Sequence, residues 1–511
     1  MIALTLVVVI LVVFYYYNTR TFKYWHERGI KHDKPIPMFG NNLQNYLMQK
    51  SVTQVAVDMY WKYSSEKVVG FFRSTRPELV IRDPEIAKRI LTIDFPFFYP
   101  RGLNPHKTVI EPLLRNLFFA DGDLWRLLRQ RMTPAFTTAK LKAMFPLISS
   151  RAERLRATIT AAAEGNSRVL DARDIMARYT TDLIGSIGFG LDTDSFSTEN
   201  SAFRKLGYDI FNVTVPEFII GVLKEIFPEA TKHLHYMFKT EKELINLVNE
   251  IQRQRNYEPS GRNDFIDLLL ELKKKGTIVG ESIERTKPDG TSEQASLEMD
   301  AELIAAQVFV FFAAGFETSS SATSFTLHQL AFHPEVQKKV QNEIDQVLTQ
   351  HNNELSYDAV KEMKYLEWTF YEGMRLFPSL GFLIRESAKK YTIPEINVTI
   401  DEGIGIIIPL QALHNDPQYF EKPEQFRPER FHPDEFDCKD KKFVYLPFGE
   451  GPRACIGARL GLMQSIAGLA AILSRFTVEP APTTLRFPMI EPKSSIVQSI
   501  RGGLPLIFRK R

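Results

Sequence analysis

Residues 447–457 read Pro447-Phe448-Gly449-Glu450-Gly451-Pro452-Arg453-Ala454-Cys455-Ile456-Gly457. The stretch holds one of only two cysteines in 511 residues, with glycines on both sides of it. Glycine lets a backbone pass close to another group because it has no Cβ. An apolar helical pattern begins at Ala458, so Cys455 is expected in a tight loop before a helix N-terminus. The free N–H groups and the dipole at that end of a helix stabilise a thiolate.

A metal bound at Cys455 would have to bring most of its own ligands. Two cysteines cannot build a four-cysteine zinc or iron–sulfur site, and Cys438 lies in a polar segment. Haem iron arrives with four nitrogen ligands, and a cysteine thiolate on it favours O–O cleavage. The alternative is an inert cysteine packed in a glycine loop, since free cysteine often behaves as a small hydrophobe.

The spacing Phe448-x-x-Gly451-x-Arg453-x-Cys455-x-Gly457 resembles the haem-binding signature of the cytochrome P450 family. The resemblance implies haem b (iron protoporphyrin IX), with Cys455 as the axial ligand of the iron. It also implies that Phe448, Gly449 and Arg453 contact the cofactor. The implied fold is mainly α with small β-sheets, and the haem lies between a long central helix and the cysteine loop.

The composition suits one large catalytic unit with a short N-terminal extension. Apolar residues make up 44% of the chain, and the net charge of +3 implies no general affinity for nucleic acid. Two cysteines provide no disulfide framework, which suits a reducing compartment. We expect a membrane anchor over residues 1–19, a basic and proline-rich hinge over 20–41, and a single haem-thiolate domain over 42–511.

The N-terminal run from Ile2 to Tyr17 is apolar except for Thr5. Positive residues follow the run at Arg20, Lys23, Arg28, Lys31 and Lys34. The positive-inside rule then places the downstream chain in the cytosol. A cleaved signal peptide would have a basic n-region and a small-residue cleavage site, and neither is visible. We therefore expect an uncleaved anchor, and the family resemblance implies that it lies in the endoplasmic reticulum membrane.

Two further motifs are expected to hold the cofactor. Trp125 and Arg129 are four residues apart on a predicted helix and share one face. They match the Trp-x-x-x-Arg of the family, whose arginine bonds a haem propionate. Arg385, at the start of a predicted strand, resembles a second propionate partner. Without the resemblance, Arg129 would be interpreted as a surface residue, and an exposed strand arginine would be an equal alternative for Arg385.

The long helical pattern from Leu303 to Phe332 contains Ala314-Gly315-Phe316-Glu317-Thr318. A glycine within a helix costs about 1 kcal/mol relative to alanine. The stretch resembles the Ala-Gly-x-Asp/Glu-Thr motif of the family, which implies catalytic roles for Ala314, Gly315, Glu317 and Thr318. The small pair would leave room for dioxygen, and the acid and hydroxyl would relay protons. The alternative is a packed helix that tolerates a glycine.

Glu372-x-x-Arg375 lies on a predicted helix from Tyr365 to Leu376. An i,i+3 ion pair is common and carries little information by itself. Its position before Pro428-Glu429-Arg430-Phe431 matches the family, in which such a pair and a later arginine form a buried ion network. The resemblance therefore implies that Glu372, Arg375 and Arg430 fix the cysteine loop.

Three segments are expected to form the substrate pocket by the layout of the family. They contribute Val310 and Phe311, Leu117 and Phe118, and Leu380 and Phe382. These side chains are apolar and predict a lipophilic small-molecule substrate. Any one of them is also a plausible core residue.

Other segments carry simpler predictions. Val68–Phe72 and Glu78–Ile81 are expected to be strands. The polar stretch from Gly276 to Asp300, centred on Lys287-Pro288-Asp289-Gly290, is expected to be an exposed loop. Residues 203–238 correspond to the two helices that cover the pocket in the family.

Six motifs in family order imply a microsomal haem-thiolate monooxygenase of the insect detoxifying type. Its electrons would come from NADPH through NADPH-cytochrome P450 reductase, with cytochrome b5 as a second donor that the family allows. The basic residues expected to face the reductase are Arg126, Arg131, Lys140, Lys142, Lys439, Lys441, Lys442 and Arg459. The expected substrates are plant toxins, insecticides or other xenobiotics.

Three alternatives to xenobiotic oxidation stay open. The first is a haem-thiolate isomerase or dehydratase, which would not need the Glu317-Thr318 relay. The second is a monooxygenase of an endogenous hormone or lipid. The third is a non-catalytic haem carrier or sensor, which NADPH-dependent turnover would exclude.

Overall fold

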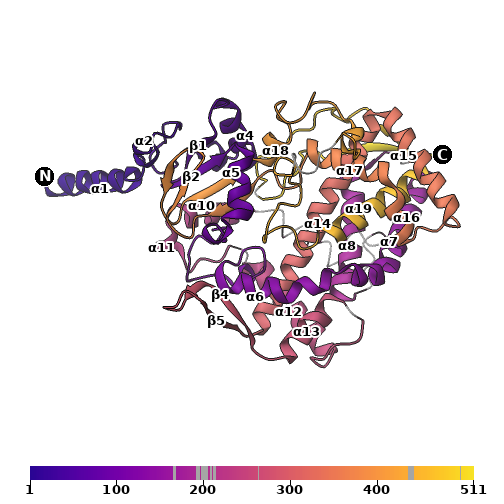
Figure 1. Cartoon of the computed structure of the whole chain (residues 1–511), viewed down its shortest axis with the longest axis horizontal. Helices are drawn as coiled ribbons and strands as arrows, with labels where there is room; N and C mark the ends of the chain where they lie inside the picture. The colour runs from indigo at the N-terminus through magenta and orange to yellow at the C-terminus, as the bar shows by residue number, and fades with distance from the viewer. Residues whose placement is uncertain are drawn as a thin grey trace.

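The computed structural model describes the 511-residue chain except residues 165–168, 192–195, 197–204, 206, 208–209, 211–213, 237, 263, 436–441 and 495. The helices are α1 (Ile2–Thr19), α2 (Tyr24–Glu27), α3 (Leu43–Tyr46), α4 (Val52–Lys62), α5 (Pro84–Lys88), α6 (Gly122–Met132), α7 (Thr138–Glu164), α8 (Ala172–Phe189), α10 (Val215–Ile226), α11 (Pro228–Thr231), α12 (Phe238–Gln254), α13 (Phe265–Lys274), α14 (Ala301–Phe332), α15 (Pro334–Gln350), α16 (Tyr357–Glu362), α17 (Lys364–Leu376), α18 (Leu410–Leu413) and α19 (Ala458–Leu473). The fold is mainly helical, as predicted (Figure 1).

The strands form small, separate sheets. They are β1 (Val68–Arg73), β2 (Arg76–Ile81), β3 (Val169–Asp171), β4 (Ile278–Thr286), β5 (Ser292–Leu297), β6 (Leu383–Glu386), β7 (Tyr391–Ile393), β8 (Val398–Ile400), β9 (Gly405–Ile408), β10 (Phe476–Pro480) and β11 (Pro505–Lys510). A four-stranded sheet has the order β1-β2-β9-β6, in which only β2 and β9 run parallel. A second sheet has the order β10-β11-β3, and β4-β5 and β7-β8 are hairpins. The two strands predicted near residues 68 and 81 are therefore confirmed.

The 32-residue helix α14 runs through the centre of the molecule (Figure 1). The side chain of Asp300 caps it by accepting a hydrogen bond from the Leu303 N–H at 2.6 Å. The helix packs against α8, α12, α17 and α19, so it is buried on nearly all sides and shows no amphipathic period. This central position places residues 310–318 beside the cysteine loop.

Among the described residues, two helices are long and apolar enough to cross a membrane. Helix α14 is one of them, but it is the core helix just described. Helix α1 is the other, and its most apolar window is only 6% buried. It projects away from the rest of the protein (Figure 1). An exposed apolar helix at this end agrees with the expected anchor.

The segment after α1 is packed, not a free connector. Trp25 is fully buried, and its indole N–H donates to the Phe71 carbonyl at 3.0 Å. The side-chain oxygen of Asn41 accepts a hydrogen bond from the Phe72 N–H at 2.9 Å. Much of the expected hinge therefore belongs structurally to the sheet that carries β1.

The segment expected to be an exposed loop, Gly276 to Asp300, is instead a β-hairpin of β4 and β5. Its inner residues Ile278 and Ala295 are buried. The Lys287-Pro288-Asp289-Gly290 stretch forms the turn, where Lys287 N–H donates to Thr291 O at 2.8 Å. The strands were not predicted because most of their side chains are polar and face outward, so apolar and polar residues do not alternate clearly in the sequence. The other face of the hairpin packs on α6. The expected lid segment, 203–238, lies partly outside the described residues, but α10 and α11 are helices as expected.

Candidate active site

The cysteine loop is a tight turn closed by its own backbone. The Cys455 N–H donates to the Phe448 carbonyl at 2.8 Å, and the Ala454 N–H donates to the Gly451 carbonyl at 3.0 Å. Gly449 and Gly451 have φ values of 67° and 77°, a region that other residues rarely adopt. Helix α19 then begins at Ala458, as predicted.

Gly451 has a second reason to be glycine. A Cβ at this position would lie 1.9 Å from the backbone oxygen of Leu91. No side chain can move to relieve that clash, because the obstacle is backbone. The cysteine loop therefore packs directly on the backbone of the helical segment Arg89–Ile93, which follows α5. This contact helps to position Cys455.

The Cys455 side chain lies deep in the protein yet is accessible, because it faces a cavity. Burial raises the pKa of its thiol, while the Gly457 N–H and the charges of Arg129 and Arg101 lower it. The helix-end effect expected from the sequence is present, but burial outweighs it. A metal ion at the sulfur would remove the proton, because a coordinating thiol is deprotonated.

Four guanidinium groups line the same cavity, from Arg101, Arg129, Arg385 and Arg453. The described lining includes no carboxylate. Asp121, just behind it, accepts from Arg453 at 2.8 Å and from the backbone N–H of Arg101 at 2.7 Å. The four buried or half-buried guanidinium groups therefore have one neighbouring carboxylate, that of Asp121, to balance their charge.

The pKa values reflect that imbalance. Burial lowers the pKa of Arg385 to about 9 and that of Arg101 to about 10. Burial also lowers the pKa of Arg129, and that of Arg453 falls well below its usual range. Buried cations without anions are unstable, so the cavity calls for a partner with negative charge.

The cavity suits a haem group on this evidence. Arg385 Nε and Arg453 Nη1 are buried and have no hydrogen-bond partner among the described residues. The two propionates of a haem would supply the missing acceptors, since guanidinium groups bind carboxylates in forked geometry. Trp125 lies 4.2 Å from the Arg453 guanidinium and presents its ring face to it. The sequence predictions of Trp125, Arg129, Arg385, Arg453, Phe448 and Gly449 all fall on this cavity wall.

Arg101 and Asp121 were not predicted as site residues. Arg101 donates to the carbonyls of Phe118 at 2.8 Å and Arg453 at 3.3 Å, and its guanidinium stacks on the Phe118 ring. Both residues lie in an irregular segment without a motif. No spacing or motif in the sequence marks either residue.

One face of α14 forms the opposite side of the cavity. Ala314, Gly315 and Thr318 line it, and the Thr318 hydroxyl donates to the Ala314 carbonyl at 2.6 Å. A Cβ on Gly315 would lie 2.4 Å from Ile184 Cδ1, so this glycine also lets α8 approach α14 closely. The helix is continuous across the motif.

Glu317 does not line the cavity. It is buried and forms an ion pair with Arg173 on α8. Burial raises the pKa of the Glu317 carboxyl, and the Arg173 guanidinium opposes the rise. On a helix, adjacent residues point about 100° apart, which is why Thr318 faces the cavity and Glu317 does not.

The predicted ion network is present and buried. Glu372 accepts two hydrogen bonds from Arg375, at 2.7 and 2.9 Å, and one from Arg430 at 3.1 Å. Its Oε1 also accepts from the Arg427 N–H at 3.0 Å. Glu372 and Arg375 are completely inaccessible to solvent. The remaining donors of Arg375 and Arg430 bind main-chain carbonyls, so the network ties several loop segments together.

His414 connects this network to the cysteine loop, and no motif in the sequence marks this residue. Arg375 donates to the His414 carbonyl at 2.9 Å. The His414 ring accepts the Leu446 N–H at 2.9 Å, and Leu446 O in turn accepts the Gly449 N–H at 2.9 Å. Burial, followed by the charge of Arg375, lowers the pKa of His414 to about 3. A neutral ring is the form that can accept a hydrogen bond.

The substrate side of the cavity is apolar. It includes all six residues predicted for the pocket: Val310, Phe311, Leu117, Phe118, Leu380 and Phe382. Leu103, Ile184, Leu383 and Ile496 extend the apolar wall. Gln307 lies one turn before Val310 on α14, and its side-chain oxygen accepts a hydrogen bond from the Leu117 N–H at 2.9 Å.

Comparisons with known proteins agree with this geometry. The family model described as Cytochrome P450 matches residues 31–505. The chain is 36% identical over 496 residues to Cytochrome P450 6B6 of Helicoverpa armigera, covering 96% of this chain and 94% of the relative. It is 37% identical over 498 residues to Cytochrome P450 6a2 of Drosophila melanogaster, covering 95% of each. It is 34% identical over 516 residues to Cytochrome P450 6k1 of Blattella germanica, covering 99% of this chain and 97% of the relative.

Proposed function

Because the chain belongs to the cytochrome P450 family and is a monooxygenase oxidoreductase with a haem-iron cofactor, we propose that it oxidises lipophilic xenobiotics such as plant toxins and insecticides. The reaction would use dioxygen and electrons from NADPH delivered by NADPH-cytochrome P450 reductase. When bound, the haem supplies the activation of dioxygen that inserts one oxygen atom into the substrate and reduces the other to water.

The observation that carries the proposal is the division of charge in the cavity. Its cations lie where the cofactor carboxylates would bind, and the walls around Val310 and Leu380 are apolar. Burying a phenyl-sized group against such walls gains roughly 1.5–3 kcal/mol. A charged substrate would lose hydration without a free partner, since the propionates would occupy the arginines.

The residues of the chain would have separate tasks. Cys455 would hold the iron through its sulfur, and Arg129, Arg385 and Arg453, with Arg101, would orient the propionates. The network of Glu372 would keep the cysteine loop in position. These contacts support haem b as the cofactor, which the family resemblance implied.

Thr318 is the best-placed residue to handle protons at the cavity. Its hydroxyl faces the cavity and now donates to the Ala314 carbonyl. Rotation about χ1 would release that proton to a water or substrate oxygen in the cavity. Glu317 could supply protons to Thr318 only after its ion pair with Arg173 opens. This hydroxyl also favours a monooxygenase over a haem-thiolate isomerase, which needs no relay.

A basic surface near the cysteine loop would receive the reductase, and cytochrome b5 would use the same face. Several of its cations are already paired: Arg126 with Glu281 at 3.1 Å, Lys142 with Asp358 at 3.1 Å and Lys442 with Glu450 at 3.5 Å. Lys439 and Lys441 lie outside the described residues. Steering by such a surface raises the association rate and fades with salt.

The exposed apolar helix α1 supports anchoring in the endoplasmic reticulum membrane. The basic residues that follow it would keep the catalytic domain in the cytosol. The boundaries at residues 19 and 41 are proposed on the same basis, with residues 1–19 as the anchor and residues 20–41 as the hinge. Parts of the hinge also pack on the sheet that carries β1.

Turnover by the purified holoenzyme with reductase tests the proposal. Lipophilic aromatic compounds should shift the Soret band in a saturable titration and yield oxygenated products only when NADPH is present. Small carboxylates should give neither result. Saturable shifts with acids alone, or conversion without NADPH, would show that the proposal is incorrect.

A further inference from the structure

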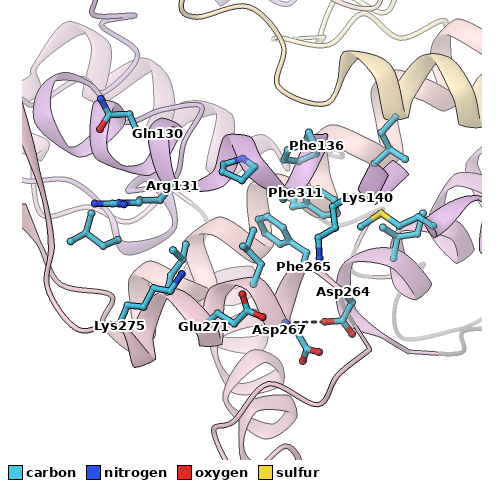
Figure 2. A pocket seen from close by; sticks show the side chains of 18 of the residues that line it. Gln130, Arg131, Phe136, Lys140, Asp264, Phe265, Asp267, Glu271, Lys275 and Phe311 are labelled. Atoms are coloured by element: carbon cyan, nitrogen blue, oxygen red, sulfur yellow. Dashed lines mark hydrogen bonds between the residues drawn. The ribbon is translucent and has the colours of Figure 1, made fainter. Parts of the chain in front are cut away.

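A second cavity of about 410 Å³ lies beside the substrate cavity. Its walls come from α6, η4 (Thr133–Phe136), α7, α8 and α13, and its size falls in the usual range for small-molecule sites. Figure 2 shows it with charged side chains around a central group of aromatic rings. We call it the outer cavity.

A wall of apolar side chains separates the outer cavity from the substrate cavity. Phe136, Phe311 and Leu460 line both cavities. The Phe311 ring stacks on Phe265 with centroids 4.2 Å apart and planes at 11°, and it lies 6.0 Å from the Phe136 ring. These rings lie together at the centre of Figure 2. A molecule in the outer cavity would therefore rest on the back of the substrate-cavity wall.

The floor of the outer cavity is apolar. Besides the aromatic rings, its apolar lining residues are Leu141, Met144, Ile187, Leu268, Leu272 and Ile278. Several of them are buried at the protein core and form a fixed surface. Such a floor binds an alkyl chain or an aromatic ring in proportion to the area removed from water.

The rim of the outer cavity carries exposed cations. Arg131 donates to the Val279 carbonyl at 3.0 Å. Neither Arg131 nor Lys275 has a carboxylate within 4.0 Å in the described part of the chain. Lys140 stands across the opening from them (Figure 2).

Two of the acidic residues at the rim share one cation. Arg255 binds Asp264 at 2.7 Å and Asp267 at 2.6 Å. Asp267 also accepts hydrogen bonds from Ser260. Among the described lining residues, this leaves Glu271 as the carboxylate that faces Arg131 and Lys275 without an ion pair. The Arg255 side of the rim therefore keeps one negative charge in excess, whereas the part that holds Arg131 and Lys275 has two cations and one carboxylate and is locally positive.

We propose that the outer cavity binds an amphipathic anion, a carboxylate or sulfonate attached to an alkyl or aromatic body. The acid group would lie between Arg131 and Lys275, and the apolar body would cover the Phe136, Phe265 and Phe311 rings. Guanidinium and ammonium groups bind such oxygens by charge-assisted hydrogen bonds. A neutral analogue would gain only the apolar contacts, and a cationic one would meet like charge. This site is separate from the cavity that would bind the substrate, so the enzyme would bind a second small molecule in addition to its substrate.

Laurate, 2-naphthoate and methyl laurate are suitable probes for calorimetric titration into the holoenzyme. Clotrimazole is added first to fill the substrate cavity, and the Soret shift that it causes reports on the haem side independently. We expect saturable binding of at least one of the two acids at one site per protein. Comparing the affinities of laurate and 2-naphthoate shows whether the apolar floor binds an alkyl chain or an aromatic ring more tightly. Methyl laurate should bind at least about tenfold more weakly than laurate.

Variants locate the site. Arg131→Glu with Lys275→Glu should weaken binding of the acids by about tenfold or more. Leu268→Trp should reduce binding by filling the floor. Lys338→Glu reverses the charge of one exposed lysine on α15 that does not line the cavity, and this control should bind like the wild type. Circular dichroism confirms that each variant is folded.

Two results would overturn the proposal. One is loss of acid binding when clotrimazole is present, which would place the acids in the substrate cavity. The other is unchanged binding in the folded Arg131→Glu, Lys275→Glu variant. Absence of the clotrimazole Soret shift would instead contradict the haem cavity, and the acids would then be titrated without the azole, so the two failures are distinguishable.

Discussion

The two cavities share a wall but hold their cations in opposite ways. The cavity that holds Cys455, the four arginines and the substrate wall is here the central cavity. In it, Arg385 and Arg453 are buried, and their pKa values are lowered. In the outer cavity, Arg131 and Lys275 are exposed at the rim. A buried guanidinium without an anion destabilises the folded protein, whereas an exposed one is solvated by water.

This difference indicates how permanently each cavity is occupied. A site with buried, unpaired guanidinium atoms requires its partner for stability, which suits a cofactor that stays bound. A site whose cations remain hydrated can be empty without cost, which suits a ligand that comes and goes.

The largest effect is expected from Cys455→Ala. Removing the sulfur removes the proposed axial ligand, so the red-shifted Soret band of the reduced carbon-monoxide complex should disappear. Absorbance spectroscopy measures this directly. The folded variant should still bind laurate or 2-naphthoate in the outer cavity, because Cys455 does not line it. A Cys455→Ala protein that keeps the band would contradict the assignment of the ligand.

Glu372→Gln should have the next largest effect. It leaves Arg375 and Arg430 buried without their carboxylate, which costs roughly 3–5 kcal/mol of unfolding free energy. Chemical denaturation with haem absorbance measures this loss and the accompanying release of haem. Glu85→Gln removes the carboxylate of an exposed i,i+3 pair with Lys88 and should cost about 0–1 kcal/mol.

Equal destabilisation by Glu372→Gln and Glu85→Gln would show that the buried network does not support the central cavity. Glu271→Gln, at the rim of the outer cavity, should likewise change stability little, since that carboxylate has no ion pair in the described structure. The three variants thus compare a buried charge with two exposed ones.

His414 should make the support of the central cavity sensitive to acid. Its pKa is about 6.5 in the unfolded chain and about 3 when folded, so between these values only the unfolded chain binds the proton. The free energy of unfolding should therefore fall as pH decreases through 6.5, by roughly 1.5 kcal/mol between pH 6.5 and 5. Thermal unfolding across this range measures the slope.

His414→Gln keeps a hydrogen-bond acceptor near the Leu446 N–H but removes the titrating group. It should flatten the acid slope, whereas Arg131→Glu at the outer cavity should not. An unchanged slope in His414→Gln would assign the acid sensitivity to other groups.

The parts of the site that could be predicted are those fixed by spacing. The positions of Phe448, Gly451 and Cys455 follow from a loop that tolerates few backbones, and Glu372 and Arg375 are one helical turn apart. Their fixed spacing made the family resemblance recognisable, and the resemblance then implied their roles. Pocket residues such as Val310 and Leu380 followed from the order of segments in the family.

The unpredicted parts depend on contacts between distant segments. Arg101 reaches the cavity from an irregular segment, and His414 joins Arg375 to Leu446 through bonds that span more than thirty residues each. The β4–β5 hairpin was missed because one face of each strand is solvated and polar. The outer cavity collects side chains from several helices, and no single stretch of sequence contains its pattern.

The smallest effect, and the most informative about chemistry, is expected from Thr318→Ala. The Thr318 hydroxyl faces the central cavity, while Glu317 is held by Arg173. Removing the hydroxyl should lower the fraction of consumed NADPH that appears as product by about fivefold, because a water can replace part of its function. Hydrogen peroxide and product are measured against NADPH in the same reaction. Thr318→Ser keeps the hydroxyl and should behave like the wild type.

Arg173→Gln completes the test of the proton route at the central cavity. It releases Glu317 without touching the residues that line the cavity. If Glu317 feeds protons to Thr318, freeing its carboxylate should raise the product fraction or leave it unchanged, and Thr318→Ala should remain uncoupled in that background. Normal coupling in Thr318→Ala would remove the hydroxyl from the mechanism. In that case the 2.6 Å bond from Thr318 to the Ala314 carbonyl would serve the helix alone, as an ordinary threonine bond to the preceding turn.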